Sequence, residues 1–101
     1  MDNTGNKIYV GDVGLAIIVD LSEDIEGATD CHLLIRKPGG TEVEWPAEVY
    51  AVNGNTQYLR YYTVAGDLNL AGRYKVQPEI TLSGWTGKGE TDEFRVYRAY
   101  R

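Results

Sequence analysis

The single cysteine and the single histidine of the sequence stand next to each other, as Cys31 and His32. Such a pair can supply a nucleophile and its base, but only if both side chains converge on one reacting atom. The surrounding residues alternate between apolar and polar, which is typical of a strand, and neighbouring strand side chains point to opposite faces. We therefore expect Cys31 to be a small buried apolar residue, His32 to be exposed on an outer face, and the chain not to be an enzyme.

Two further segments carry ligand-binding residue types. The acids between Asp20 and Asp30 could offer oxygens to Ca²⁺, but their spacing is not that of an EF-hand and no second acidic loop pairs with them. Residues 84–89 are glycine-rich and include Lys88, but they lack the spacing of a phosphate-binding loop. We expect a solvated acidic loop and a hairpin respectively, with no metal ion and no cofactor.

The two tryptophans suggest different roles. Trp85 lies in the expected hairpin, where it would either fold back over the end of the domain or present itself to a partner or a sugar. Stacking of a glycan on Trp85 and nearby tyrosines would make the chain a carbohydrate-binding module, which is the alternative function. Trp45, which is followed by Pro46, is expected to plug the edge of the core where a long strand kinks.

Composition excludes several classes of protein. A chain of 101 residues is the size of one domain, and one cysteine cannot form an internal disulfide. The net charge of −5 disfavours nucleic acid, since phosphate binding depends on clustered lysine and arginine. No apolar run approaches the roughly 20 residues of a membrane span. We expect a single domain over 1–101, with a short flexible start at 1–6 and a basic tail at 98–101.

Charge is spread unevenly along the chain. Residues 1–50 contain ten acids and three bases, whereas residues 51–101 contain five acids and seven bases. This pattern fits a solvated acidic domain with a frayed basic end. It also fits a polar molecule whose basic tail docks onto an acidic neighbour, such as a second copy of the chain. The tail residues that would make this contact are Arg98, Tyr100 and Arg101.

Seven short segments between turn signals alternate between apolar and polar residues, as half-buried strands do. No stretch keeps the helical spacing for three turns, so we expect no long helix. Strands that each have one apolar face must bury it against a second sheet, which predicts an all-β, two-sheet antiparallel sandwich. The expected strands are 7–10, 15–21, 30–37, 42–51, 56–63, 73–82 and 90–97.

The sequence DLNLAGRYKV at residues 67–76 resembles the turn into the sixth strand of immunoglobulin-like domains, where a tyrosine forms a hydrogen-bonded corner. Tyr74 is the matching tyrosine. The resemblance places the second disulfide cysteine of that family at Val76, and the family's tryptophan on the third strand is also absent. It therefore implies a seven-stranded immunoglobulin-like sandwich of the kind that lacks a disulfide.

Residues 8–14, 33–42 and 45–47 are similar to the immunoglobulin-like N-terminal domain of phage baseplate upper proteins. There, a Gly-Asp turn enters a strand, a later strand closes on a Lys-Pro-x-Gly-Thr hairpin, and a tryptophan follows. The resemblance implies a non-enzymatic structural or adaptor subunit of a phage or prophage particle, in the tail, baseplate or capsid decoration. Its expected location is the virion, assembled in the bacterial host cytoplasm, and its partners would be other virion proteins and copies of itself.

One surface of the expected sandwich has the composition of a protein interface. If Leu59 faces the core, Tyr58, Arg60 and Tyr62 face outward, and in an immunoglobulin-like sandwich Ile18 lies on the neighbouring strand. Aromatic residues and arginine are enriched at the centres of interfaces. We expect these four residues to form a contact patch, unless the register is shifted by one or loops cover the strands.

Overall fold

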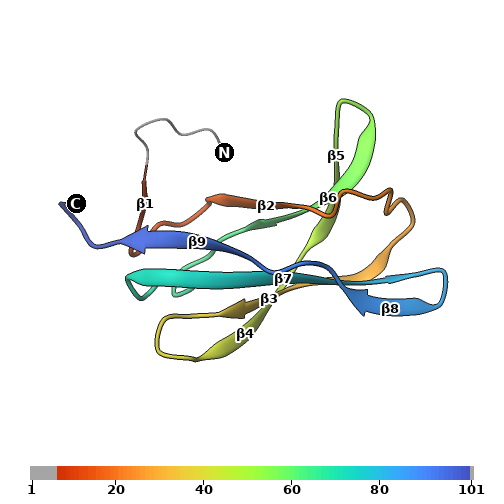
Figure 1. Cartoon of the computed structure of the whole chain (residues 1–101). Coiled ribbons are helices and arrows are strands. Elements are labelled where there is room, and N and C mark those ends of the chain that lie inside the picture. The colour runs from red at the N-terminus through yellow and green to blue at the C-terminus, as the bar shows by residue number, and fades with distance from the viewer. Residues whose placement is uncertain (1–6, 101) are drawn as a thin grey trace.

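A computed structural model describes residues 7–100, and Figure 1 shows its arrangement. Within this range the chain forms nine strands and no helix. The strands are β1 (Ile8–Tyr9), β2 (Ala16–Asp20), β3 (Thr29–Arg36), β4 (Glu42–Pro46), β5 (Glu48–Val52), β6 (Asn55–Tyr62), β7 (Gly72–Leu82), β8 (Trp85–Lys88) and β9 (Asp92–Tyr97). No helix that could span a membrane is present in the described part of the chain.

The strands form two sheets that pack into a sandwich-like arrangement (Figure 1). The larger one, sheet A, has the order β1-β9-β7-β3-β4, with β8 paired to the far half of β7. The smaller one, sheet B, has the order β2-β6-β5. All pairings are antiparallel except that of β1 with β9, which is parallel. The expected all-β sandwich is confirmed.

The core lies between the sheets and is built from alternate residues of each long strand. Leu33 and Ile35 of β3 and Leu59 of β6 are at most 1% exposed. Cys31 and Trp45 belong to the same cluster, so the expected burial of Cys31 is confirmed. Because each strand offers one apolar face, closing the two faces on each other removes both from water, which is the main stabilising term.

The expected strand 42–51 is divided between the two sheets. It pairs with β3 as far as Pro46, then crosses at Ala47 and continues as β5 beside β6. Trp45 fills the core at this crossing, where its ring stacks on Tyr61 with 4.9 Å between centroids. The expectation that Trp45 plugs the core is confirmed, but the break is a change of sheet and not a kink within one strand.

The segment after β7 also differs from expectation, because β8 is a strand within what was expected to be a hairpin connection. With β8 and the division of 42–51, the expected count of seven strands is wrong. Pro78 lies where the neighbour of β7 changes from β9 to β8. No strand of the described residues pairs with β7 on that side at this residue, so the missing amide hydrogen of proline costs no hydrogen bond of the sheet. Gly89 closes this junction by donating its amide to the Pro78 carbonyl, and a Cβ on Gly89 would meet the proline ring at 2.8 Å.

Tyr74 forms the hydrogen-bonded corner that the local sequence predicts. Its side chain is fully buried, and its hydroxyl donates to the Leu70 carbonyl at 2.8 Å and accepts from the Leu70 amide at 3.1 Å. The ring stacks on Phe94 of β9. Burial raises the pKa of Tyr74. The corner fixes the connection between β6 and β7, and so ties the two sheets together.

Candidate protein-contact surfaces

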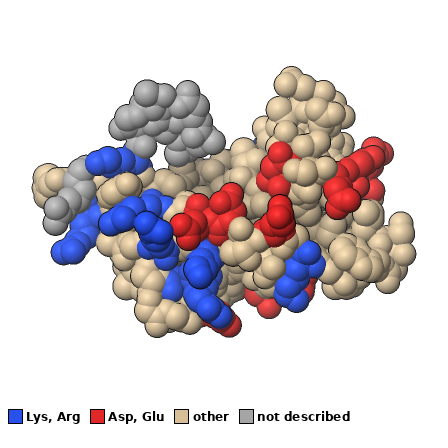
Figure 2. All heavy atoms as spheres, in the orientation of Figure 1, with Lys and Arg blue, Asp and Glu red and all other residues tan. Residues whose placement is uncertain are grey.

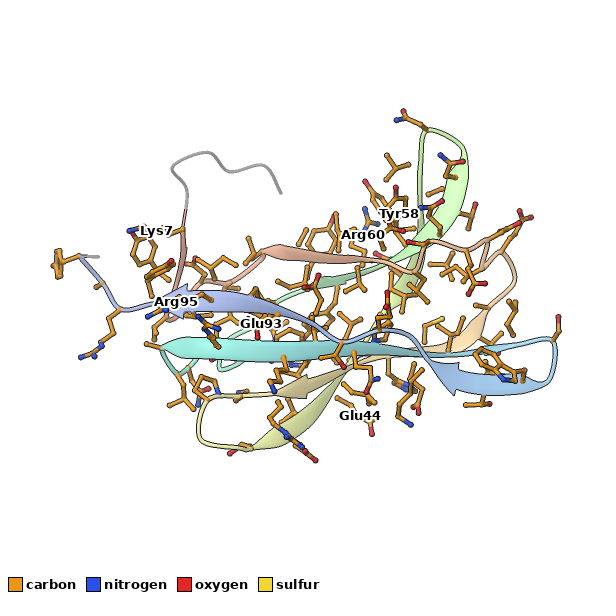
Figure 3. All side chains as sticks on the ribbon, viewed as in Figure 1. Lys7, Glu44, Tyr58, Arg60, Glu93 and Arg95 are labelled. Carbon is orange, nitrogen blue, oxygen red and sulfur yellow. The ribbon has the colours of Figure 1, made fainter. Side chains whose placement is uncertain are left out.

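The outer side of sheet B carries a cluster of aromatic side chains around one arginine. Ile18 pairs with Arg60, and Tyr50 pairs with Tyr58, so these residues point to the same side of three adjacent strands. Tyr62 follows on the same side of β6, and Figure 3 shows Tyr58 and Arg60 directed away from sheet A. We call this surface the tyrosine–arginine face; its residues are Ile18, Tyr50, Tyr58, Arg60 and Tyr62.

Arg60 is held at the centre of this face by charge and by ring contacts. Glu48, its direct neighbour on β5, accepts a hydrogen bond from Arg60 Nε at 2.9 Å, and a second guanidinium nitrogen forms an ion pair with the same carboxylate oxygen at 2.8 Å. The guanidinium carbon lies 4.1 Å from the Tyr50 ring centroid and 5.0 Å from that of Tyr62. The hydrogen bond to Glu48 raises the pKa of Arg60, so the side chain stays charged. The result is a cation fixed between two aromatic rings.

The face is accessible. Ile18 is 46% exposed and Tyr62 is 49% exposed, while Tyr58 and Arg60 are half-buried by their neighbours. The expected register and outward orientation of Ile18, Tyr58, Arg60 and Tyr62 are confirmed. Tyr50 is not among the four expected residues, because the sequence predicts one continuous strand over residues 42–51 and does not show that its second half pairs with β6. Pro46, which removes a donor from that strand, was the signal for the break.

Basic residues gather at the end of the molecule where β9 and β7 meet. Arg73 and Arg95 stand directly opposite each other on neighbouring strands. The Tyr97 ring lies between two cations, with Lys7 Nζ at 4.8 Å and the Arg95 guanidinium carbon at 5.4 Å from its centroid. Figure 2 shows this concentration of lysine and arginine at one end and acids over the middle and the other end.

The expected basic tail is only partly described. Arg98 is exposed, and Tyr100 is fully exposed with a left-handed backbone. Neither has a hydrogen bond, ion pair or ring contact in the described part of the chain. Arg101 and the segment 1–6 lie outside the described residues. The tail residues and the tyrosine–arginine face are therefore separate candidates and are not joined into one site.

Trp85 is exposed on the hairpin formed by β7 and β8. It is 58% exposed, and its ring lies along its own strand over Gly87, where a Cβ would come within 2.1 Å of the indole. Among residues 7–100 no tyrosine or other aromatic ring contacts it. The expected companion tyrosines of a sugar-stacking platform are thus not brought to Trp85.

Cys31 and His32 point to opposite sides of β3, as expected. Burial raises the pKa of the Cys31 thiol, which keeps it protonated and unreactive. His32 differs from expectation because it is half-buried, between Pro46 and Glu79 on the flanking strands. Its Nδ1 is enclosed without a hydrogen-bond partner. β3 lies between β4 and β7, and side chains from these two strands cover His32 although it is on the outer side of the sheet. A residue on an edge strand would have such a neighbour on one side only.

The acidic loop between β2 and β3 has an internal structure. Asp20 accepts from the Ser22 amide and from Gln57 Nε2, both at 2.8 Å, while Ile25 anchors the loop in the core. Its remaining carboxylates are exposed. No group of three or more metal-ligating side chains occurs within the described ranges of the chain.

The outer side of sheet A is hollowed into a shallow groove between β4 and β7. Leu34 forms its floor, and side chains of both signs form its rims, among them Arg36, Glu44 and Lys75. The lining therefore combines apolar side chains with charges of both signs. Comparison of the chain with protein-family models, with curated protein sequences and with solved structures finds no match.

Proposed function

We propose that the chain is a non-enzymatic binding domain that acts through protein–protein contacts, with the tyrosine–arginine face as its main contact surface. The observation that carries this proposal is the fixed position of Arg60 between Tyr50 and Tyr62, with Glu48 orienting its guanidinium. Tyrosine and arginine side chains supply much of the binding energy at protein interfaces. A side chain already held in place loses little conformational freedom when a partner binds it.

The finer fold that we propose is the immunoglobulin-like topology. Three features support it: β2, β6 and β5 share one sheet; β9, β7, β3 and β4 share the other; and β1 joins β9 in parallel. The corner that Tyr74 makes with Leu70 is a fourth supporting feature. A fold of this kind hosts many functions, so it supports a binding role only together with the surface described above.

The setting that we propose is a phage or prophage particle, in which the chain is a structural or adaptor subunit of the tail, the baseplate or the capsid decoration. The support is the sequence resemblance of residues 8–14, 33–42 and 45–47. These residues build β1 with its following turn, the β3–β4 hairpin and the crossing to sheet B. On this proposal the chain resides in the virion after assembly in the bacterial host cytoplasm, and contacts other virion proteins.

Quantitative mass spectrometry of purified particles tests the setting. Particles are prepared from a host that carries the coding gene, and the copy number of the chain is determined. We expect a copy number that matches a symmetry of the head or the tail, which would also identify the part of the particle. An expressed chain that is missing from the particles would overturn the virion proposal.

The contact surface is tested by replacing Arg60 with alanine in the same gene. Arg36→Ala is the matched control, because Arg36 is an ion-paired arginine on the outer side of the other sheet. We expect particles to lose the Arg60→Ala chain and to retain the Arg36→Ala chain, while thermal melting shows that both fold. Equal incorporation of the two variants would rule out the tyrosine–arginine face as the contact.

Glycan binding through Trp85 is the second candidate, and the exposure of this ring is the observation that favours it. A titration with a panel of soluble glycans, followed by tryptophan fluorescence, distinguishes the two functions. Buried Trp45 supplies a constant background. Saturable quenching that Trp85→Ala abolishes would support sugar binding. A flat response would leave protein contact as the function.

A further inference from the structure

The outer edge of β2 is an unpaired strand edge. β2 ends sheet B, and no strand lies on its far side within residues 7–100. Leu21 donates its amide to the Gln57 carbonyl, and Thr63 donates to the Leu15 carbonyl, so odd-numbered residues of this segment bond to β6. By strand alternation, the amides and carbonyls of Ala16, Ile18 and Asp20 therefore point outward, away from the sheet.

The other edges of the two sheets carry features that oppose pairing with a further strand. β1 has two residues and β8 has four. β5 has a register irregularity after Tyr50. On β4 the outward positions are Glu42, Glu44 and Pro46, by the same alternation argument from the Lys37–Thr41 and Cys31–Ala47 bonds. Charge, proline, bulges and short length are the usual protections of a sheet edge.

β2 has none of these protections along most of its length. Its sequence is Ala-Ile-Ile-Val-Asp, with a charge only at its last residue, and it pairs with β6 in an unbroken register. Ile18, at the middle of the edge, is 46% exposed. β-Branched residues on a regular strand edge are the features that favour the addition of another strand.

We infer that β2 pairs with β2 of a second copy of this chain, in an antiparallel two-fold arrangement centred on Ile18. This inference names the partner of the β2 edge, and it rests on the proposal that the chain functions through protein–protein contacts. Sheet B would then continue across the two copies as a single six-stranded sheet. The tyrosine–arginine faces of both copies would lie on the same side of that sheet, next to each other.

A second copy fits this edge because the edge is complementary to itself. Centred on Ile18, the outward groups of Ala16 meet those of Asp20 in the other copy, and Ile18 meets Ile18. This register makes about six main-chain hydrogen bonds. It sets Asp20 opposite alanine and keeps the two aspartates several residues apart, so no like charges face each other. On the outer side the two exposed Ile18 side chains contact, which removes both from water.

Salt separates this contact from the other arrangement that the charge distribution suggests. Each copy carries a net charge of −5, so pairing through an apolar edge brings like-charged molecules together. Added salt screens that repulsion over about 10 Å at 0.1 M and strengthens the dimer. A contact between the basic end and the acidic loop of another copy would weaken with salt instead. The two arrangements thus respond to salt with opposite signs.

Sedimentation velocity of the purified full chain tests the inference at two salt concentrations, about 50 mM and about 500 mM. The paired edge is a single strand of five residues, so we expect a weak dimer whose population rises with protein concentration, as for small interfaces. Ile18→Lys should weaken dimerisation at least tenfold, because two cations would meet at the centre. Val64→Lys is the matched control, since Val64 is also exposed, lies outside any strand and receives the same charge.

Hydrogen exchange identifies the surface that is used. We expect the amides of Ala16, Ile18 and Asp20 to gain at least tenfold protection between dilute and concentrated solution. A chain that stays monomeric would overturn the inference, as would a dimer that weakens with salt or one that Ile18→Lys and Val64→Lys affect equally. Protection of these amides that does not change with concentration would also overturn it, because the edge would then be covered within one copy.

These outcomes do not decide the virion proposal. A chain that is monomeric in solution but present in particles at symmetric copy number would refute the β2 pairing alone. A chain that dimerises through β2 but is absent from particles would refute the virion setting alone. Thermal melting of both variants shows whether either substitution acts by unfolding the domain.

Discussion

The edges formed by β2 and β4 have the same length and position in their sheets, but mostly apolar residues line the first and acidic residues the second. Each is a five-residue strand at the end of its sheet, and each directs the main-chain groups of three alternate residues outward. On β2 these residues are Ala16, Ile18 and Asp20, and on β4 they are Glu42, Glu44 and Pro46. The β4 edge has two charged side chains and lacks one donor, whereas the β2 edge can form regular pairing with another strand.

The comparison shows that exposure alone does not make a strand edge adhesive. Residues on both edges are exposed, and both strands contribute to the core from their inner sides, through Ile17 and Val19 on β2 and Trp45 on β4. The two edges differ in the side chains of the residues whose main-chain groups point outward. If these side chains decide whether another strand can pair with the edge, then apolar substitutions on β4 should let it pair, and a charged substitution on β2 should prevent pairing.

The largest effect is expected when the β4 edge is given the chemistry of β2. In the double variant Glu42→Val, Glu44→Val, each molecule would have two edges in different sheets that can pair with another strand, so each molecule could bind two neighbours and the assembly could extend without closing. We expect this purified double variant to form large assemblies that scatter light at concentrations where the unmodified chain does not. Glu42→Gln, Glu44→Gln is the control for loss of charge. Similar solubility of the valine and glutamine variants would show that charge loss alone sets the behaviour of the edge.

The sequence predicts the faces of these strands better than it predicts which strands are neighbours. Residues 42–51 alternate in one unbroken phase, although the chain changes sheet at Ala47. Both sheets turn their inner sides to the same core, so inward and outward positions keep their order across the change. Alternation alone therefore cannot distinguish one long strand from two strands in different sheets, and it gives no sign that Tyr50 lies beside Tyr58 of β6.

The residues of the candidate site can be predicted from alternation, because the site requires only that their side chains point to the outer side of the sheet. Ile18, Tyr58, Arg60 and Tyr62 lie on two regular strands that pair without a bulge, so alternation placed them correctly. β8 could not be found in this way. Its pairing to β7 depends on main-chain bonds, and glycine at position 87 leaves no side chain to mark an inward or outward position.

Shortening a buried leucine beside each edge strand tests whether β2 and β4 are held to the core equally strongly. Leu59 on β6 pairs with Val19 of β2, and Leu33 on β3 pairs with Trp45 of β4; both leucines are fully buried. We expect Leu59→Ala and Leu33→Ala each to lower the free energy of unfolding by about 2–5 kcal/mol. Urea unfolding followed by tryptophan fluorescence measures both. A cost confined to Leu33→Ala would mean that β2 is loosely held and that its edge differs in stability, not only in chemistry.

Alkaline pH is expected to lower the stability of the domain through Tyr61, which links β6, the neighbour of β2, to β4. Tyr61 of β6 stacks on Trp45 of β4 and donates a hydrogen bond to Asp67 at 2.6 Å. Burial and this bond raise the pKa of Tyr61 from 10 to about 12. Above pH 10 the unfolded chain releases this proton while the folded chain retains it, so stability is full below pH 10 and falls as the pH rises toward 12.

Unfolding measured across this pH range should show a shallower loss of stability in Tyr61→Phe than in the unmodified chain. Some loss should persist, because burial also raises the pKa of Tyr74. Tyr62→Phe is the control, since that tyrosine is exposed on the outer side of the same strand. Equal slopes for Tyr61→Phe and the unmodified chain would show that the Tyr61 proton is not retained by folding.

The smallest effect is expected from the ion pair on the protected edge. Arg36 of β3 pairs with Glu42 of β4, and the two side chains are 57% and 64% exposed. Water and salt screen such a pair, so Arg36→Gln should change the free energy of unfolding by about 0.5 kcal/mol or less. The variant leaves Glu42 unneutralised, which increases the negative charge along the β4 edge. We therefore expect sedimentation to show no association beyond that of the unmodified chain. New association in Arg36→Gln would mean that the paired arginine, and not the carboxylates, keeps other strands from the β4 edge.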